Sequence, residues 1–161
     1  MLNSNYKLKD FFPLIIIFSI ISLITLVHQI YYGTNYHDGM RIFMAAFFVI
    51  FGTFKVINIA GFAQAYSVYD LIANRFYIYG YIYPIIELSL GAAYLFKWHL
   101  FITNIATLVL MIISAAGVFN ELRKGKQITC ACLGVVFKIP MTYVTLIEDL
   151  LMAIMALLML L

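Results

Sequence analysis

The two cysteines of this 161-residue chain lie one residue apart, at Cys130 and Cys132, just before Gly134. A thiolate is both a nucleophile and a ligand for soft metal ions, and nearby positive charge favours its formation. Four basic residues surround the pair in the same predicted loop: Arg123, Lys124, Lys126 and Lys138. The cysteine pair is therefore the first candidate for chemistry.

The Cys-x-Cys spacing is compatible with three interpretations. Cysteines two residues apart can just reach the Cα separation of a disulfide, about 4.4–6.8 Å, which suits a redox-active dithiol. Two thiolates also suit linear Cu(I) or two corners of a zinc site. In the third interpretation the cysteines are inert and pack at the mouth of a helical bundle.

Four ionisable residues fall inside long apolar stretches: Lys55, Glu87, Glu148 and Asp149. Charges at bilayer depth usually face the interior of a bundle and often have a function. Lys55 and Glu87 could form a structural ion pair or belong to a proton or ion relay. The two adjacent acids exceed what one lysine can neutralise, and a difference of about 100° around a helix predicts that they point in different directions.

The three histidines do not extend the cysteine site. His28, His37 and His99 are scattered along the chain, and the predicted topology places them nearer the opposite membrane face. We therefore do not expect a closed four-ligand zinc site.

The elements that hold these residues are predicted from composition. The chain is 65% hydrophobic and 11% charged, with a mean hydropathy of +1.02, whereas soluble domains carry roughly 25% charged residues. We expect an all-α integral membrane protein embedded in the lipid bilayer. The net charge of +3 is too small and too dispersed to indicate nucleic-acid binding.

Five stretches have about the 20 residues needed to cross a bilayer. They are residues 12–31, 42–62, 77–96, 99–119 and 140–161, with Pro140 expected to open the fifth helix. Residues 63–76 are more polar and predict a short helix on the membrane surface. We expect residues 1–40 to form an N-terminal anchor and loop, and residues 41–161 a four-helix membrane domain.

Small and polar residues share one face of several predicted spans, which indicates faces that pack inside the bundle. On the third span these residues are Gly80, Pro84, Glu87, Gly91 and Tyr94; on the fourth they are Asn104, Thr107, Met111, Ser114 and Gly117. On the second span Gly52, Lys55 and Asn58 form a shorter polar stripe.

The distribution of lysine and arginine predicts the orientation of the chain, because cytoplasmic loops are enriched in both. With five spans, seven basic residues lie on the side of the N-terminus: Lys7, Lys9, Arg75, Arg123, Lys124, Lys126 and Lys138. Only Arg41 and Lys97 lie on the other side. The N-terminus and the cysteine loop are therefore predicted to be cytoplasmic.

Several motifs together resemble the MauE/DoxX-like family of redox-associated membrane proteins. The resemblance covers about residue 44 to the C-terminus and rests on the following runs: Phe51-Gly52-Thr53-Phe54-Lys55, Tyr69-Asp70-Leu71-Ile72-Ala73, Tyr83-Pro84-Ile85-Ile86-Glu87-Leu88, Cys130-Ala131-Cys132-Leu133-Gly134, Lys138-Ile139-Pro140-Met141-Thr142 and Val144-Thr145-Leu146-Ile147-Glu148-Asp149. It implies a four-helix core in a bacterial inner membrane and a role in thiol redox chemistry that matures proteins outside the cytoplasm, as in methylamine dehydrogenase assembly. The implied site is Cys130 and Cys132, supported by Lys55, Glu87, Glu148 and Asp149.

Three functions follow from these observations. The first is a thiol-redox accessory protein of the membrane, similar to a thiol-disulfide oxidoreductase, with Cys130 and Cys132 as the exchanging pair and a thioredoxin-like partner. Since the chain has no second cysteine pair, a quinone or a partner would complete the electron transfer. The second is a carrier of Cu(I) or Hg(II) that uses the same cysteines and a metal-binding partner, as some relatives are labelled. The third is a structural membrane subunit.

Overall fold

The computed structural model describes residues 11–33, 35–124, 129–133, 139–140 and 143–161. Six helices account for most of this part of the chain, and one pair of short strands lies between the last two helices. The helices are α1 (Phe12–Tyr32), α2 (Tyr36–Ile57), α3 (Ile59–Tyr66), α4 (Ile78–Leu95), α5 (Leu100–Arg123) and α6 (Tyr143–Leu158). The strands β1 (Thr129–Cys130) and β2 (Ile139–Pro140) pair in antiparallel orientation. The predicted helical architecture is confirmed.

Three of the described helices, α1, α2 and α5, are long and apolar enough to cross a membrane. Helix α4 has 18 residues and contains Pro84 and the charged residue Glu87. Helix α6 has 16 residues, about 24 Å of helical rise, against a hydrocarbon core of roughly 30 Å. The protein is thus a multi-pass membrane protein, while the five predicted spans remain a prediction.

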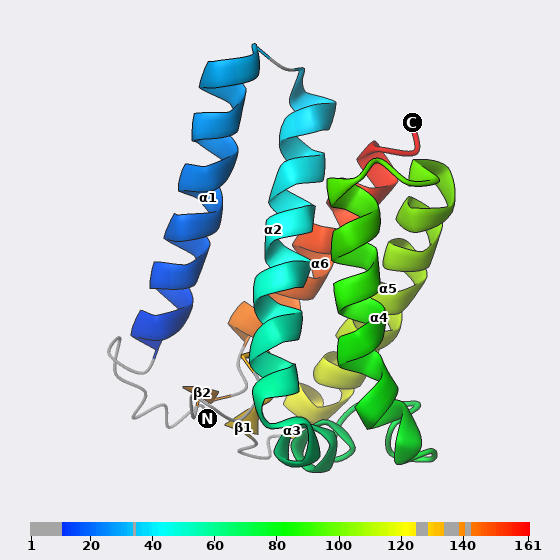
Figure 1. Cartoon of the computed structure of the whole chain (residues 1–161). Helices are drawn as coiled ribbons and strands as arrows, with labels where there is room; N and C mark the ends of the chain where they lie inside the picture. The colour runs from blue at the N-terminus through cyan, green and yellow to red at the C-terminus, as the bar shows by residue number, and fades with distance from the viewer. Residues whose placement is uncertain (1–10, 34, 125–128, 134–138, 141–142) are drawn as a thin grey trace.

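The helices alternate in direction between two ends of the molecule (Figure 1). Helices α2, α4, α5 and α6 form the main bundle, with α2 packed along α4 and α5 along α6. Helix α1 lies at the side and packs against α2. The strands and α3 lie at the end where α1 begins, and the C-terminus lies at the opposite end.

The faces predicted to pack inside the bundle are buried on α4 and α5. Glycine allows two of these contacts to be close. A Cβ atom on Gly91 would lie 3.0 Å from the backbone nitrogen of Val49 on α2, and one on Gly117 would lie 2.7 Å from the carbonyl oxygen of Tyr69. These glycines let neighbouring backbones approach, as small residues commonly do between membrane helices.

The boundary predicted between the second span and the surface helix is wrong. Helix α2 ends at Ile57 instead of residue 62, because Asn58 leaves the helical region with φ −136°. The Asn58 side chain accepts a hydrogen bond from the Gly61 backbone at 3.1 Å and so caps α3. Asn58 is therefore an exposed capping residue, and the polar stripe of α2 is reduced to Gly52 and Lys55.

The segment predicted to form a short surface helix, residues 63–76, lies at the end of the bundle. Four of its residues are buried against protein: Ala63, Tyr66, Tyr69 and Ala73. Helix α3 ends at Tyr66, and the residues after it form successive turns. The predicted helix is therefore correct only up to Tyr66.

The predicted start of the fifth span is also wrong. Pro140 belongs to β2, where its partner is Thr129, and helix α6 begins only at Tyr143. This short strand pair closes the loop that contains the cysteines. Glu148 therefore lies about 7.5 Å along α6 from its first residue, instead of the 12 Å expected from a helix that starts at Pro140.

Candidate thiol site

Cys130 and Cys132 are joined by a disulfide in the loop between α5 and α6, with their Cα atoms 5.6 Å apart. Cys130 ends β1, and the strand pairing with β2 fixes the loop at this point. Cys130 is only 1% exposed, whereas Cys132 is partly accessible. The two sulfur atoms therefore differ in their access to a reagent.

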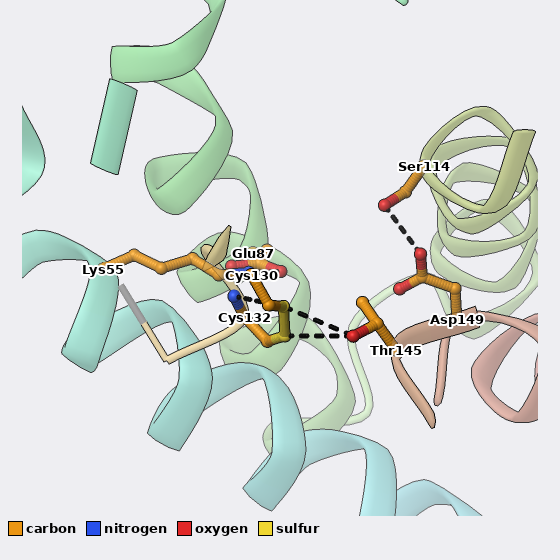
Figure 2. Close-up of a disulfide and its surroundings, with 7 residues drawn as sticks. All are labelled: Lys55, Glu87, Ser114, Cys130, Cys132, Thr145 and Asp149. Atoms are coloured by element: carbon orange, nitrogen blue, oxygen red, sulfur yellow. Dashed lines mark hydrogen bonds and ion pairs between the residues drawn. A yellow bond between two sulfur atoms is a disulfide. The ribbon is translucent and has the colours of Figure 1, made fainter. Parts of the chain in front are cut away.

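The hydrogen-bond donors at the disulfide point mainly toward one sulfur (Figure 2). The Cys132 backbone N–H donates to Cys130 Sγ at 3.1 Å, and the Thr145 hydroxyl donates to the same atom at 3.4 Å. The Thr145 oxygen lies farther from Cys132 Sγ, at 3.7 Å. Thr145 is buried in the first turn of α6, so α6 positions a hydroxyl that can stabilise negative charge on Cys130.

Tyr69 holds the cysteine loop from the other side. This residue is buried, and its hydroxyl forms a hydrogen bond with the Ala131 backbone. Burial raises the pKa of the Tyr69 phenol above its ordinary value, and the contact with Ala131 acts in the opposite direction. The neighbouring Tyr66 hydroxyl donates to Asp70 Oδ2 at 2.8 Å. These contacts fix the segment that supports the disulfide.

A buried ion pair connects α2 with α4 beside the disulfide (Figure 2). Lys55 Nζ lies 2.5 Å from Glu87 Oε1, and the two residues are 5% and 1% exposed. The Lys55 ammonium also lies 4.9 Å from the centroid of the Tyr83 ring and 5.5 Å from that of Phe62. These aromatic faces provide further electrostatic stabilisation of the buried cation.

The acids of α6 both approach the same interior space. Ser114 on α5 donates a hydrogen bond to Asp149 Oδ2 at 2.8 Å. Glu148 is 6% exposed, and its Oε1 has no hydrogen-bond partner in the described part of the chain. Although the two side chains diverge around the helix, both line one cavity.

That cavity has a volume of about 30 Å³, enough for about one or two water molecules. Its lining brings together the groups that the sequence singled out: Lys55, Glu87, Cys132, Glu148 and Asp149. Thr145, Ser114, Tyr66, Tyr69 and Tyr83 complete its polar wall. The arrangement places a disulfide at the edge of a small polar chamber enclosed by an apolar bundle.

Of the basic residues expected to favour the thiolate, the structure describes Arg123 and Lys124, and these two contact other groups. Lys124 forms an ion pair with Glu121, and the Arg123 guanidinium lies over the Phe119 ring at 5.7 Å. Lys126, Gly134 and Lys138 lie outside the described residues. Neutral donors, the Thr145 hydroxyl and a backbone N–H, contact Cys130 instead.

The histidines lie at the other end of the molecule. His28 is near the end of α1, His37 is in the first turn of α2, and His99 precedes α5, all far from the strand end shown in Figure 1. In the described ranges no three His, Cys, Asp or Glu residues are grouped so that they could hold a metal ion.

Sequence reasoning missed Thr145, Ser114 and Tyr69 as members of the site. Thr145 and Tyr69 were each within a motif that resembled the family, and Ser114 was on the predicted interior face of its span. Their contact with the disulfide and Asp149 depends on how α5, α6 and the segment after α3 pack together, and helical periodicity does not determine such packing.

Comparison with known proteins identifies the family. No curated protein and no solved structure gives a significant match to the chain. The family model described as methylamine utilisation protein MauE matches residues 23–161. This match begins inside α1, closer to the N-terminus than the start near residue 44 expected from the motifs. Because it covers most of the chain, the protein belongs to the MauE family.

Proposed function

We propose that this protein is a thiol-redox accessory protein of the membrane, in which Cys130 and Cys132 exchange a disulfide with the thiols of another protein. The observation that carries the proposal is the disulfide itself, which has two hydrogen-bond donors on one sulfur and an enclosed polar cavity beside it. A purely structural cross-link of two residues that are nearly adjacent in sequence would constrain little of the unfolded chain.

The two sulfurs have different roles in this proposal. A thiolate of the partner attacks the more accessible Cys132 Sγ, the Cys130–Cys132 bond breaks, and its electron pair leaves on Cys130. The Thr145 hydroxyl and the Cys132 N–H stabilise the Cys130 thiolate that forms. A second partner thiol then displaces Cys132 from the mixed disulfide. The partner gains a disulfide, and this chain gains two thiols.

The partner is proposed as a dithiol protein, either a thioredoxin-like carrier or an extracytoplasmic protein that needs a disulfide to mature. The family description concerns methylamine utilisation, and maturation of a protein in such a system is compatible with the exchange. The enclosed cavity at the disulfide then holds the proton-accepting groups, Glu148 and Asp149, within a few residues of Thr145.

Trapping of mixed disulfides tests the proposed roles. In Cys130→Ser the Cys132 thiolate attacks glutathione disulfide and releases one glutathione thiol; because Cys130 is absent and the bound glutathione has no second thiol to expel Cys132, we expect a long-lived mixed disulfide. In Cys132→Ser the buried Cys130 should form at least tenfold less of this adduct. Gel shift after alkylation measures both. Equal trapping by the two variants would contradict the assignment, and no trapping by either would contradict the exchange.

A further inference from the structure

A large apolar groove lies between α1 and α6, open to the surroundings of the bundle. Its volume is about 680 Å³, and most of its lining is aliphatic, including Leu14, Leu23 and Leu26 on α1 and Leu151 on α6. Helix α1 packs mainly against α2 (Figure 1), and the groove lies along the side of α1 that faces α6. From Leu14 to Leu26 the groove follows about 18 Å of helix.

One ionisable residue interrupts the apolar lining. Glu148 lines this groove and also lines the small cavity that contains Cys132. It is 6% exposed, and its Oε1 has no hydrogen-bond partner within the described ranges. Glu148 therefore separates the groove from the disulfide chamber and presents an unpartnered carboxyl oxygen between them.

A residue that contacts the disulfide lies one helical turn from Glu148. Thr145, which contacts both sulfur atoms, lies three residues before Glu148 on α6. Side chains three residues apart are neighbours on one face of a helix, at about 5–6 Å between Cβ atoms. A ligand in the groove that contacts Glu148 would thus be close to the wall of the cavity formed by Cys132 and Thr145.

The electron balance requires an acceptor that the chain does not itself contain. If Cys130 and Cys132 oxidise a partner repeatedly, their thiols must pass two electrons and two protons to an acceptor in each cycle. The chain has two cysteines in all, so no second thiol pair can receive these electrons. An acceptor that reaches the site through an apolar, laterally open groove must be soluble in the bilayer.

We propose that the groove between α1 and α6 binds a lipid quinone, with its isoprenoid chain along α1 and its ring at Glu148. The inference rests on the proposed function, because it supplies the acceptor for the same dithiol. The two thiols and one quinone give the Cys130–Cys132 disulfide and one quinol. The Glu148 carboxyl group donates a proton to a quinone oxygen and is reprotonated from the chamber that holds Cys132.

A phospholipid acyl chain could fill the apolar part of the groove but would form no polar contact with Glu148. It offers no acceptor for the Glu148 carboxyl group and takes no electrons. A quinone carbonyl oxygen matches the unpartnered carboxyl, and buried polar groups normally have such a partner. The chemistry of Glu148 therefore favours a redox-active ring over a hydrocarbon alone.

The test uses the full chain in detergent, decyl-ubiquinone as the acceptor and an azido-decylquinone as a photolabel. The matched variants are Ser19→Trp and Ser89→Trp. Both serines are exposed on helices and donate to the carbonyl four residues earlier at 2.8 Å, but only Ser19 lines the groove. We expect Ser19→Trp to weaken quinone binding at least tenfold and Ser89→Trp to leave it unchanged, with the photolabel on α1 or α6.

Reoxidation kinetics provide the second measurement. After reduction with dithiothreitol, the wild-type protein should regain its disulfide when decyl-ubiquinone is added, and Glu148→Gln should slow that step about tenfold. Equal binding by the two tryptophan variants, or equal competition by decylbenzene, which has no carbonyl group, would overturn the quinone site.

The two proposals fail in different ways. A disulfide that is reduced by dithiothreitol but is never reoxidised by the quinone would overturn the further inference and leave thiol exchange intact. A protein that binds the quinone at the groove but whose cysteines never react would overturn the proposed function. In that second case the loss of binding in Ser19→Trp would still support the groove as a quinone site.

Discussion

At the scale of single residues, the Lys55–Glu87 pair has the clearest structural consequence. Both charges are buried and paired, so Lys55→Met would leave Glu87 without a counter-charge. Breaking such a pair typically costs about 3–5 kcal/mol, whereas replacing both partners by apolar residues is often neutral. We expect Lys55→Met to lower the free energy of unfolding by that amount and Lys55→Met/Glu87→Leu to recover most of it, as measured by denaturation in detergent.

The pair Lys124–Glu121 provides the control, because its lysine is 47% exposed. Loss of an exposed pair costs about 0–1 kcal/mol, so Lys124→Met should be nearly neutral. If the double variant at Lys55 and Glu87 is stable but cannot exchange thiols, the pair takes part in the chemistry. If that variant remains as unstable as Lys55→Met, the ion-pair account of its stability is wrong.

Residue types in the sequence predicted much of the site. Of the two cysteines and the four ionisable residues expected to support them, five line one cavity, and the sixth, Cys130, is bonded to Cys132. The sequence did not reveal Thr145 as the donor to Cys130. That contact depends on how the first turn of α6 packs against the cysteine loop.

At the scale of secondary-structure elements, the approach of α5 to the segment after α3 sets the position of the cysteine loop. A Cβ atom on Gly117 would lie 2.7 Å from the Tyr69 carbonyl oxygen, and Tyr69 holds Ala131 through its hydroxyl. We expect Gly117→Ala to displace this segment, to lower the thermal stability and to make the disulfide more rapidly reducible. The rate of alkylation after a short pulse of dithiothreitol measures the change.

The neighbouring Ala116 is exposed on the same helix and provides a matched position. Ala116→Leu adds more volume than Gly117→Ala but meets no backbone, so its reduction rate should equal that of the wild type. A Gly117→Ala protein with unchanged stability and an unchanged reduction rate would show that the close approach is not required to hold the loop.

Element boundaries were the least predictable feature of the fold. Hydropathy predicted long helices and their buried faces, because the lipid environment selects apolar residues over whole turns. It could not reveal the break at Asn58, which depends on one capping side chain. Nor could it reveal the pairing of β1 with β2, which joins residues nine and eleven positions apart in the sequence.

At the scale of the whole molecule, basic residues are unequally distributed between the two ends. Arg75, Arg123 and Lys124 lie toward the disulfide end, whereas Arg41 and Lys97 at the other end both contact Asp38. The positive-inside rule counts lysine and arginine whether or not they are paired with acids, and three of these residues lie toward the disulfide end against two at the other. The positive-inside rule therefore predicts that this end faces the cytoplasm.

Labelling from outside the cell tests this orientation. In a chain lacking Cys130 and Cys132, we expect Lys97→Cys to react with a membrane-impermeant maleimide in intact cells and Lys124→Cys to react only after the membrane is opened. The reverse pattern would place the disulfide on the oxidising side of the membrane, where disulfides normally persist. Labelling of both positions in intact cells would contradict the predicted alternation of the helices.

The central claim is that the Cys130–Cys132 disulfide breaks and re-forms at the redox potentials at which proteins exchange thiols and disulfides. A redox titration of the full chain in membranes, with thiols trapped by alkylation at each potential, tests it most directly. We predict one two-electron transition with a midpoint between about −300 and −100 mV, which is the range of exchanging dithiols. A disulfide that stays intact across this range, or thiols that never form one, would contradict the account.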